Sequence, residues 1–374
     1  MHGIAIAPLA NSDRIVKTSA RVPQPSQASD VDDISRRNFL GKAAFTGALV
    51  APFARAANSD LQSDDRSIGP LADSAARIIA VDSRFAAMLD PMAAITRHQT
   101  GSKWSEGPAW NAAGKYLVWS DVRNNRQLRW LEEDGHVSEF RNPSNHTNGC
   151  TFDAYGRMLT CEQVGRQVVR HEGDGSTTML ANSIDGVSLN SPNDIVVHPN
   201  GGVWFTDPGY GAPKPLPQKE AIYRIDGTTG VIARVSDALS KPNGLCFSPD
   251  FTQLYIADTG LGKENALFRF DVVAGRRLTN PKPFAQIRFN ELAAGPDGQQ
   301  VDAQGNLWAS SGHGVDGING VHVFDPAGTL LGVILLPETC ANVCFGGTNQ
   351  DRLFMTATTS LYSVPTLTRA AHGA

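Results

Sequence analysis

Six oxygen-bearing side chains recur along the sequence at nearly regular intervals. They begin six similar segments, separated by 42, 45, 50, 54 and 45 residues, and are Glu106, Asn148, Asn193, Asn243, Asp297 and Asn342. Two are carboxylates and four are amides, and the set holds no thiol and no imidazole. Such oxygens suit a hard divalent cation, calcium above all, which takes about six to eight oxygen ligands from carboxylates, amide carbonyls and water. The ligand types are also compatible with magnesium, manganese or zinc.

A simpler explanation of these positions is turn formation, because Asn or Asp followed by Gly suits a tight turn. Glu106 argues against it, since glutamate gains nothing from turn geometry. Asn193 is followed by Asp194 and not by glycine. Taken together, the six positions favour a ring of polar side chains.

The segments that begin at these residues share the outline of a β-meander. Each has a short apolar strand, a polar turn, a second strand and, after a gap, a third strand. Residues 151–160 align in this way with residues 196–205, 246–255 and 300–309. Six units of about 40–50 residues predict an all-β fold, a six-bladed β-propeller with a central channel. A two-domain α/β enzyme is the competing fold, and the lack of a long periodic helix between the strands disfavours it.

A propeller converts this periodicity into geometry. Equivalent positions of the blades lie at the same height and radius around the channel, so we expect the six side chains to converge near one mouth. His146, two residues before Asn148, is expected at the rim of that mouth, with a plain surface loop as the alternative. No G-x-S-x-G, H-E-x-x-H or Walker A sequence occurs, which disfavours serine-hydrolase and zincin chemistry.

The composition narrows the class of protein. The chain has 374 residues and a formal net charge of −4, with 41% hydrophobic and 19% charged residues, too apolar for a disordered chain. No basic cluster is interleaved with aromatic residues, so nucleic acid is not an expected partner. No apolar run reaches the ~18 residues of a membrane span. The five cysteines match no zinc spacing, and we expect buried thiols, with a cross-strand bridge between Cys150 and Cys161 as the alternative.

The N-terminal region predicts export. Residues 35–42 read Ser-Arg-Arg-Asn-Phe-Leu-Gly-Lys, and a short apolar stretch and the small-x-small sequence Ala54-Arg55-Ala56 follow. This order is typical of a twin-arginine signal, with the twin-arginine export machinery as partner and the periplasm as destination. We therefore divide the chain into a disordered n-region with its signal (1–56), an N-terminal segment with a ring-closing strand (57–100) and the catalytic propeller (101–374).

The repeat starts and the sequences around them resemble the senescence-marker-protein/gluconolactonase family, most closely its bacterial gluconolactonases. The resemblance extends over about residues 75–365. It is carried by residues 105–110 (Ser-Glu-Gly-Pro-Ala-Trp), 148–153 (Asn-Gly-Cys-Thr-Phe-Asp), 191–194 (Ser-Pro-Asn-Asp), 204–211 (Trp-Phe-Thr-Asp-Pro-Gly-Tyr-Gly), 241–245 (Lys-Pro-Asn-Gly-Leu), 295–298 (Gly-Pro-Asp-Gly) and 341–347 (Ala-Asn-Val-Cys-Phe-Gly-Gly).

The resemblance implies a catalytic divalent metal in the channel, held by Glu106, Asn193, Asn243 and Asp297. Asp297 is expected both to contact the metal and to guide proton removal from the attacking water, and Glu106 to hold the ion and neutralise its charge. The substrate contacts are assigned to Asn148, Asn193, His146 and Asn342.

The activity implied is metal-dependent opening of a sugar lactone such as glucono-δ-lactone. Two alternatives stay beside it: hydrolysis of another lactone, ester or phosphotriester with the same metal, and a binding propeller without catalysis. Some family members that act on sugar lactones carry arginine where this chain has Ser191.

Overall fold

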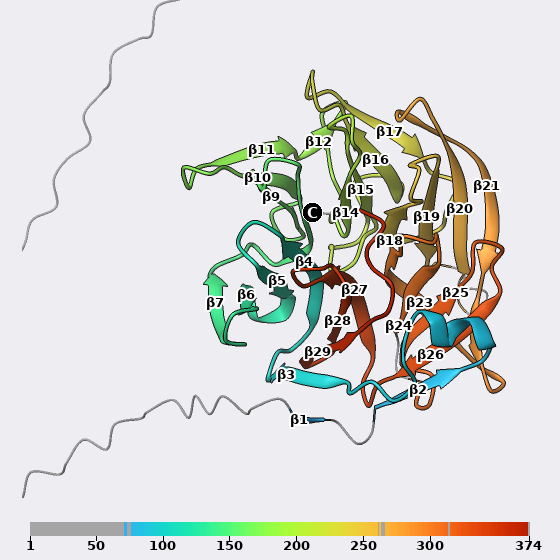
Figure 1. Ribbon diagram of the computed structural model, residues 1–374. Helices are drawn as coiled ribbons and strands as arrows, with labels where there is room; N and C mark the ends of the chain where they lie inside the picture. The colour runs from blue at the N-terminus through green and yellow to red at the C-terminus, as the bar shows by residue number, and fades with distance from the viewer. Residues whose placement is uncertain (1–70, 73–75, 261, 263–265, 313–314, 373–374) are drawn as a thin grey trace, which may run out of the picture. The chain divides into compact units, whose positions relative to one another are not determined.

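The computed structural model is a ring of β-sheets around a central channel (Figure 1). It describes residues 71–72, 76–260, 262, 266–312 and 315–372. The predicted export signal and the n-region before it lie outside the described residues. Six sheets of four to six strands form the blades, which confirms the predicted six-bladed propeller.

The first three blades follow one another along the chain, each an antiparallel meander. Blade 1 consists of β4 (Ser105–Asn111), β5 (Tyr116–Asp121), β6 (Arg126–Leu131) and β7 (Val137–Arg141). Blade 2 consists of β8 (Thr147–Phe152), β9 (Met158–Glu162), β10 (Gln167–His171) and β11 (Thr177–Ala181). Blade 3 consists of β14 (Ile195–Val197), β15 (Val203–Asp207), β16 (Ala221–Ile225) and β17 (Ile232–Ser236).

The last three blades complete the ring. Blade 4 consists of β18 (Pro242–Phe247), β19 (Gln253–Asp258), β20 (Ala266–Val273) and β21 (Arg277–Ala285). Blade 5 is built on β23 (Leu292–Val301), β24 (Leu307–Gly312), β25 (Gly320–Phe324) and β26 (Leu330–Leu335). Blade 6 is built on β27 (Cys340–Gly346), β28 (Arg352–Ala357) and β29 (Ser360–Pro365).

Short elements extend this plan. A small hairpin, β12 (Ser183–Ile184) and β13 (Val187–Ser188), follows blade 2, and β22 (Ile287–Phe289) pairs with the start of β23. Two 3-10 helices are described, η1 (Ser83–Ala87) and η2 (Val122–Asn124). In the part of the chain that the structure describes, no helix is long and apolar enough to cross a membrane.

The N-terminal segment is built into the last two blades. β3 (Thr96–Thr100) pairs antiparallel with β29 and supplies the missing strand of blade 6, with β1 (Leu71–Ala72) along its free edge. β2 (Arg77–Ala80) pairs with β26 at the edge of blade 5. Blade 6 therefore combines strands from both ends of the propeller, so that hydrogen bonds between distant segments close the ring.

The innermost strand of every blade packs against its two neighbours, in the order β4, β8, β14, β18, β23, β27 and back to β4. Large apolar side chains fill the wedges between blades. In one wedge, Trp308 of β24 is fully buried, with ring centroids 6.3 Å from Phe85 of η1 and 5.4 Å from Phe345 of β27. The five cysteines are free and buried, which confirms the expected thiols.

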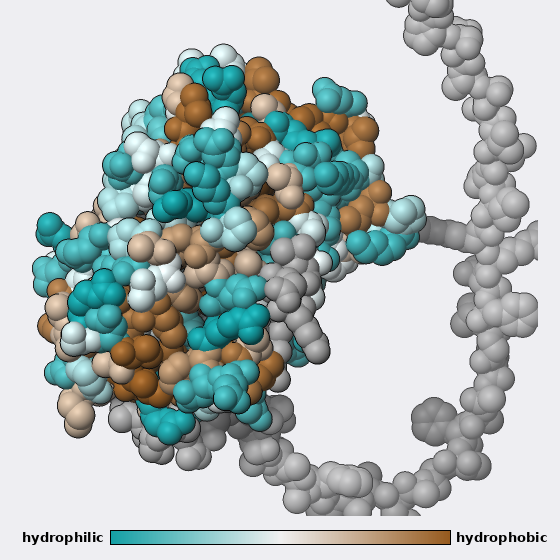
Figure 2. Space-filling view, turned by 90° about the vertical axis from the view of Figure 1, so that its right-hand side faces the viewer, coloured by the Kyte–Doolittle hydropathy of each residue, from teal (hydrophilic) through white to brown (hydrophobic). Residues whose placement is uncertain are grey.

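The outer strands face solvent. Most residues of β21 are exposed. Figure 2, which views the ring from the right-hand side of Figure 1, shows hydrophilic and hydrophobic residues interspersed over the surface. The alternation of strand side chains thus separates a dry core between the blades from a wet outer edge.

The wedge around Trp308 predicts a large cost for truncation. Trp308→Ala is expected to lower the free energy of unfolding by about 3–5 kcal/mol, because it leaves a cavity where two blades and η1 meet. The measurement is denaturant unfolding followed by circular dichroism. Met92→Ala is the control, since Met92 is 88% exposed and its truncation should change stability by no more than about 0.5 kcal/mol. Equal losses in the two variants would contradict this account of the core.

Candidate active site

Five of the six repeat-start residues lie in strands and not in turns, and Asn193 lies two residues before β14. In five of the six inner strands, the pairing with the next strand shifts register at the site residue. These shifts lie between Glu106 and Ala109, Thr147 and Cys150, Pro242 and Leu245, Pro296 and Gln299, and Cys340 and Asn342. A β-bulge breaks the alternation of side chains and re-aims one of them. The same irregularity, repeated around the ring, directs the polar side chains to the channel.

Crowding between the inner strands explains the glycine that often follows. A Cβ on Gly107 would lie 2.2 Å from the carbonyl oxygen of Asn148 in the next blade, and Gly107 has a φ of +48°. A Cβ on Gly244 would meet the Asp297 carbonyl oxygen at the same distance. Only glycine therefore lets neighbouring inner strands approach this closely beside the site.

One cavity of about 970 Å³ collects most of the predicted site residues. Its lining includes Glu106, His146, Asn148, Asn193, Asn243 and Asp297. Asn342 does not line it: its side chain faces a second cavity of about 70 Å³ and donates to Glu106 Oε2 at 3.5 Å. Five of the six repeat starts thus share the large cavity, and the sixth supports Glu106.

The amides at the site are tied to one another and to the loop after β15. Asn193 Nδ2 donates to Asn243 Oδ1 at 2.5 Å, and Asn243 Nδ2 donates to the Tyr210 hydroxyl at 3.3 Å. The Tyr210 hydroxyl also hydrogen-bonds Thr259. Gln163 Nε2 donates to Asn193 Oδ1 at 3.4 Å. These contacts fix the amide planes at the cavity wall.

Three carboxyl groups are buried near the channel: Glu106, Asp194 and Asp297 are 4%, 8% and 4% exposed. Glu106 and Asp297 line the large cavity, whereas Asp194 lines the small one. Burial, and then the charge of Asp194, raise the pKa of Glu106 to about 7. Burial, and then the charges of Glu106 and Asp194, raise the pKa of Asp297 well above its ordinary value. Burial raises the pKa of Asp194 to about 6. Neutral hydrogen-bond donors alone oppose these shifts.

This concentration of buried like charge fits a divalent cation. The donors are carboxylate and amide oxygens, which hard cations prefer, and a cation would relieve the mutual repulsion of the carboxylates. Among the described residues, Asn148 Oδ1 is buried without a hydrogen-bond partner, so one more oxygen at the cavity wall lacks a donor. The described residues contain no metal-binding cluster of three or more His, Cys, Asp or Glu side chains, because here amides supply half of the set.

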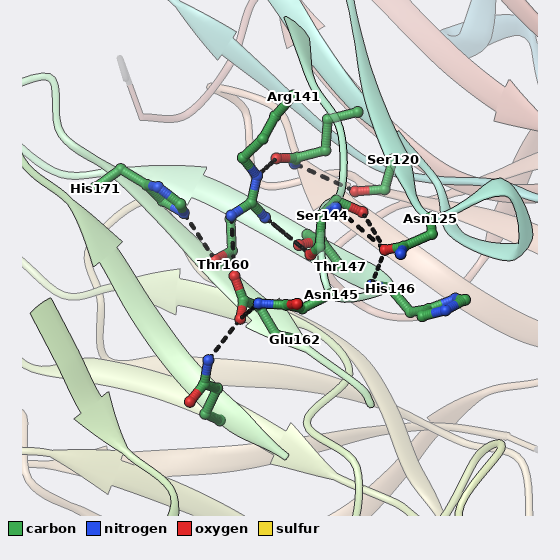
Figure 3. Close-up of polar contacts among 12 residues, drawn as sticks. Ser120, Asn125, Arg141, Ser144, Asn145, His146, Thr147, Thr160, Glu162 and His171 are labelled. Carbon is green, nitrogen blue, oxygen red and sulfur yellow. Dashed lines mark hydrogen bonds and ion pairs between the residues drawn. The ribbon is translucent and has the colours of Figure 1, made fainter. Parts of the chain in front are cut away.

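His146 is held in place by the connection between blades 1 and 2 (Figure 3). Arg141 bridges Glu162 at 3.0 Å and Thr147 at 2.6 Å, while Asn125 Oδ1 accepts from the backbone N–H of His146 at 2.8 Å. The His146 ring points away from this network, and its Nδ1 lies 2.8 Å from the Val122 carbonyl oxygen. Because a carbonyl only accepts, Nδ1 carries the proton, and in the neutral ring Nε2 remains an acceptor.

Sequence reasoning missed several residues of this site. Trp104 donates from Nε1 to Glu106 Oε1 at 3.2 Å, and Arg123 and Arg166 line the cavity. They lie outside the repeated pattern, so periodicity could not single them out. Asp194 was visible beside Asn193, where most repeats have glycine, and that departure was the signal for a third buried carboxyl group.

Comparison with known proteins agrees with this geometry. Residues 104–359 match the SMP-30/Gluconolactonase/LRE-like region. The chain belongs to this family. A gluconolactonase from Xanthomonas campestris is 35% identical, with a TM-score of 0.72 over 80% of this chain and 97% of that protein.

Two curated relatives are lactonases. A gluconolactonase of Zymomonas mobilis is 29% identical over 78% of this chain and 86% of its own. The pentonolactonase XacC of Haloferax volcanii is 28% identical over 69% of this chain and 82% of its own. The resemblance seen in the repeat starts is therefore confirmed at the level of the family.

The raised carboxyl pKa values predict an unusual dependence of stability on pH. Without divalent metal, folded Glu106 binds its proton more tightly than in the unfolded chain, where its pKa is near 4.5. The folded state then holds more protons, so the free energy of unfolding should fall as pH rises from about 5 to about 8. Glu106→Gln should flatten this fall, as measured by denaturant unfolding in a chelator.

Glu133→Gln is the matched control, because Glu133 is exposed and its loss should leave the slope unchanged. An equal slope in wild type and Glu106→Gln would show that Glu106 does not contribute to this proton linkage.

Proposed function

We propose that the chain is a metal-dependent sugar-lactone hydrolase that opens a lactone such as glucono-δ-lactone to the aldonic acid. The observation that carries the proposal is the pair of buried carboxyl groups, Glu106 and Asp297, which line one channel cavity with two amides. Membership of the family and the lactonase relatives support the reaction type.

Glu106, Asn193, Asn243 and Asp297 would hold the divalent cation, most simply calcium. Asn193 and Asn243 present amide oxygens, and the two carboxylates balance the charge. When bound there, a divalent cation supplies Lewis-acid polarisation of the lactone carbonyl.

Asp297 is proposed as the residue that handles the proton. Burial, and then the charges of Glu106 and Asp194, raise the pKa of Asp297 and make it a stronger base than an exposed aspartate. Its carboxylate accepts a proton from water as the water oxygen bonds to the carbonyl carbon. The bond between that carbon and the ring oxygen then breaks, and the released alkoxide takes up the proton. One water is consumed, and the product is the open-chain hydroxy acid.

The remaining wall residues orient the substrate. Asn148 offers a buried oxygen without a partner, and the Nε2 atom of His146 is free to accept from a substrate hydroxyl. Asn193 is hydrogen-bonded to Gln163 and to Asn243 in the cavity wall. Asn342 acts through Glu106, to which it donates.

The decisive experiment is hydrolysis of glucono-δ-lactone, corrected for spontaneous opening, after chelation and after add-back of calcium, zinc, manganese or magnesium. Activity should disappear with the chelator and return with one ion. Asp297→Asn should lower kcat about 100-fold or more, because it loses the proton acceptor. A loss smaller than about tenfold would exclude this role for Asp297.

A panel of other lactones, esters and a phosphotriester tests the substrate class in the same assay. Turnover of a phosphotriester in preference to every lactone would replace the lactonase proposal. No turnover of any substrate by a folded, metal-loaded sample would favour a binding propeller.

The twin arginines support export of the protein to the periplasm. Arg36→Lys with Arg37→Lys keeps the charge and changes only the guanidinium pair that the export route reads. We expect the double variant to stay in the cytoplasm, as measured by cell fractionation and immunoblotting. Lys17→Arg is the control outside the motif, and undiminished periplasmic protein in the double variant would refute the assignment.

A further inference from the structure

The charged side chains that line the channel cavity separate into two groups by burial. Glu106 and Asp297 are buried, whereas Arg123 is exposed and Arg166 is half-buried. The cavity thus presents carboxylates at its buried end and guanidinium groups where it meets solvent. A ligand that spans the cavity experiences charges of opposite sign at its two ends.

Arg123 is linked through the side chain of Trp104 to Glu106, at the buried end of the cavity. It lies on η2, directly after β5 of blade 1. Its guanidinium carbon lies 5.5 Å from the centre of the Trp104 ring, and Trp104 Nε1 donates to Glu106 Oε1. The stacking on the indole orients the guanidinium and uses none of its N–H donors.

Arg166 approaches the cavity from blade 2. It lies in the turn between β9 and β10, where its backbone N–H donates to the Gln163 carbonyl at 3.2 Å. Gln163 in turn donates to Asn193. Arg123 thus contacts a side chain that donates to Glu106, and Arg166 shares its turn with a residue that donates to Asn193. The two arginines come from adjacent blades.

Within the described ranges, neither guanidinium forms an ion pair with a carboxylate. Asp207 feels the charge of Arg166, but its oxygens accept from the backbone N–H groups of Asn190 and Ser191, each at 2.7 Å. By contrast, Arg126 and Arg141, on the strands next to these turns, are paired with Asp121 and Glu162. The two cavity arginines thus keep their hydrogen-bond donors for a ligand.

We propose that Arg123 and Arg166 form an anion subsite that recognises a negatively charged substituent on the lactone, remote from the reacting carbonyl. This inference rests on the proposed function and names its substrate class: sugar lactones with a phosphate, sulfonate or carboxylate group. The carboxylates at the buried end repel such a group and the arginines attract it, so the lactone enters with its neutral carbonyl end first. Guanidinium forks bind tetrahedral and planar oxyanions through paired hydrogen bonds.

The carboxylate of the product is a different anion. It forms at the carbon that the water attacks, beside Glu106 and Asp297, and not at the arginine end. Inhibition by the product therefore shows whether the arginines bind the product carboxylate or a remote anionic substituent.

The test compares a double variant with a matched control. Arg123→Gln/Arg166→Gln removes the two cavity charges. Arg276→Gln/Arg288→Gln removes two charges from exposed arginines that do not line the cavity. Both proteins are assayed, metal-loaded, on glucono-δ-lactone and on 6-phosphoglucono-δ-lactone.

We expect the wild type and the control to prefer the phosphorylated lactone. The loss in kcat/KM of the cavity variant should be about tenfold or more larger on that substrate than on glucono-δ-lactone, since each charge-assisted hydrogen bond stabilises the complex. Sodium chloride should lower the wild-type rate on the phosphorylated lactone and leave the cavity variant unaffected.

Three results would overturn the proposal. The first is an equal loss of kcat/KM on both lactones, and the second is a wild type that does not prefer the phosphorylated lactone. The third is an inhibition constant for gluconate that rises in the cavity variant by the same factor as kcat/KM on the phosphorylated lactone falls. Turnover of glucono-δ-lactone with any of these results leaves the proposed function in place and refutes the subsite alone.

Binding measurements test the anion subsite independently of catalysis. Isothermal titration calorimetry with 6-phosphogluconate and with gluconate requires no turnover. Tighter binding of the phosphorylated acid that disappears in the cavity variant would support the subsite even in a protein that opens no lactone, which would refute only the proposed function. Equal binding of the two acids by the wild type would count against the subsite.

Discussion

The structure depends on holding three carboxyl groups together in a place that water hardly reaches. Burial raises the pKa values of Glu106, Asp194 and Asp297. The charge of Asp194 adds to the shift of Glu106, and the charges of Glu106 and Asp194 add to that of Asp297, while neutral donors such as Trp104 and Asn342 compensate only in part. Buried like charges destabilise a fold unless a cation or proton joins them. The rigid core between the blades offsets this cost, so the channel keeps a geometry that the side chains alone would not adopt.

The ring provides that rigidity in two ways. Each inner strand packs against the inner strands on both sides, and the close approach at Gly107 and Gly244 leaves no room for the strands to shift. β3 then joins β29, so the segment before blade 1 completes blade 6. A displacement of one blade would strain its neighbours around the whole circle. The site residues are therefore preorganised by packing far from the channel.

The cavity is lined by residues of the repeated inner strands and by residues of loops that are not repeated. Its buried end comes from bulges at equivalent positions of the inner strands, whereas its outer part comes from loops such as those that carry Arg123, Arg166 and Tyr210. In the proposed reaction, the residues that act on the carbonyl come from the ring, which cannot change without loss of packing. The residues proposed to select among lactones come from the loops, which can change in sequence and leave the ring intact.

The sequence by itself determined the number of blades and the polar set at the channel, because a propeller turns a repeat along the chain into a circle and equivalent residues into neighbours. It also indicated which of these residues carry charge. Only the tertiary structure decided that Asn342 faces a second cavity and supports Glu106, and that Asp194 joins the buried carboxyl groups. It alone brought Trp104 and the two arginines to the cavity. These contacts join loops of different blades, whose positions depend on packing around the whole ring and leave no period in the sequence.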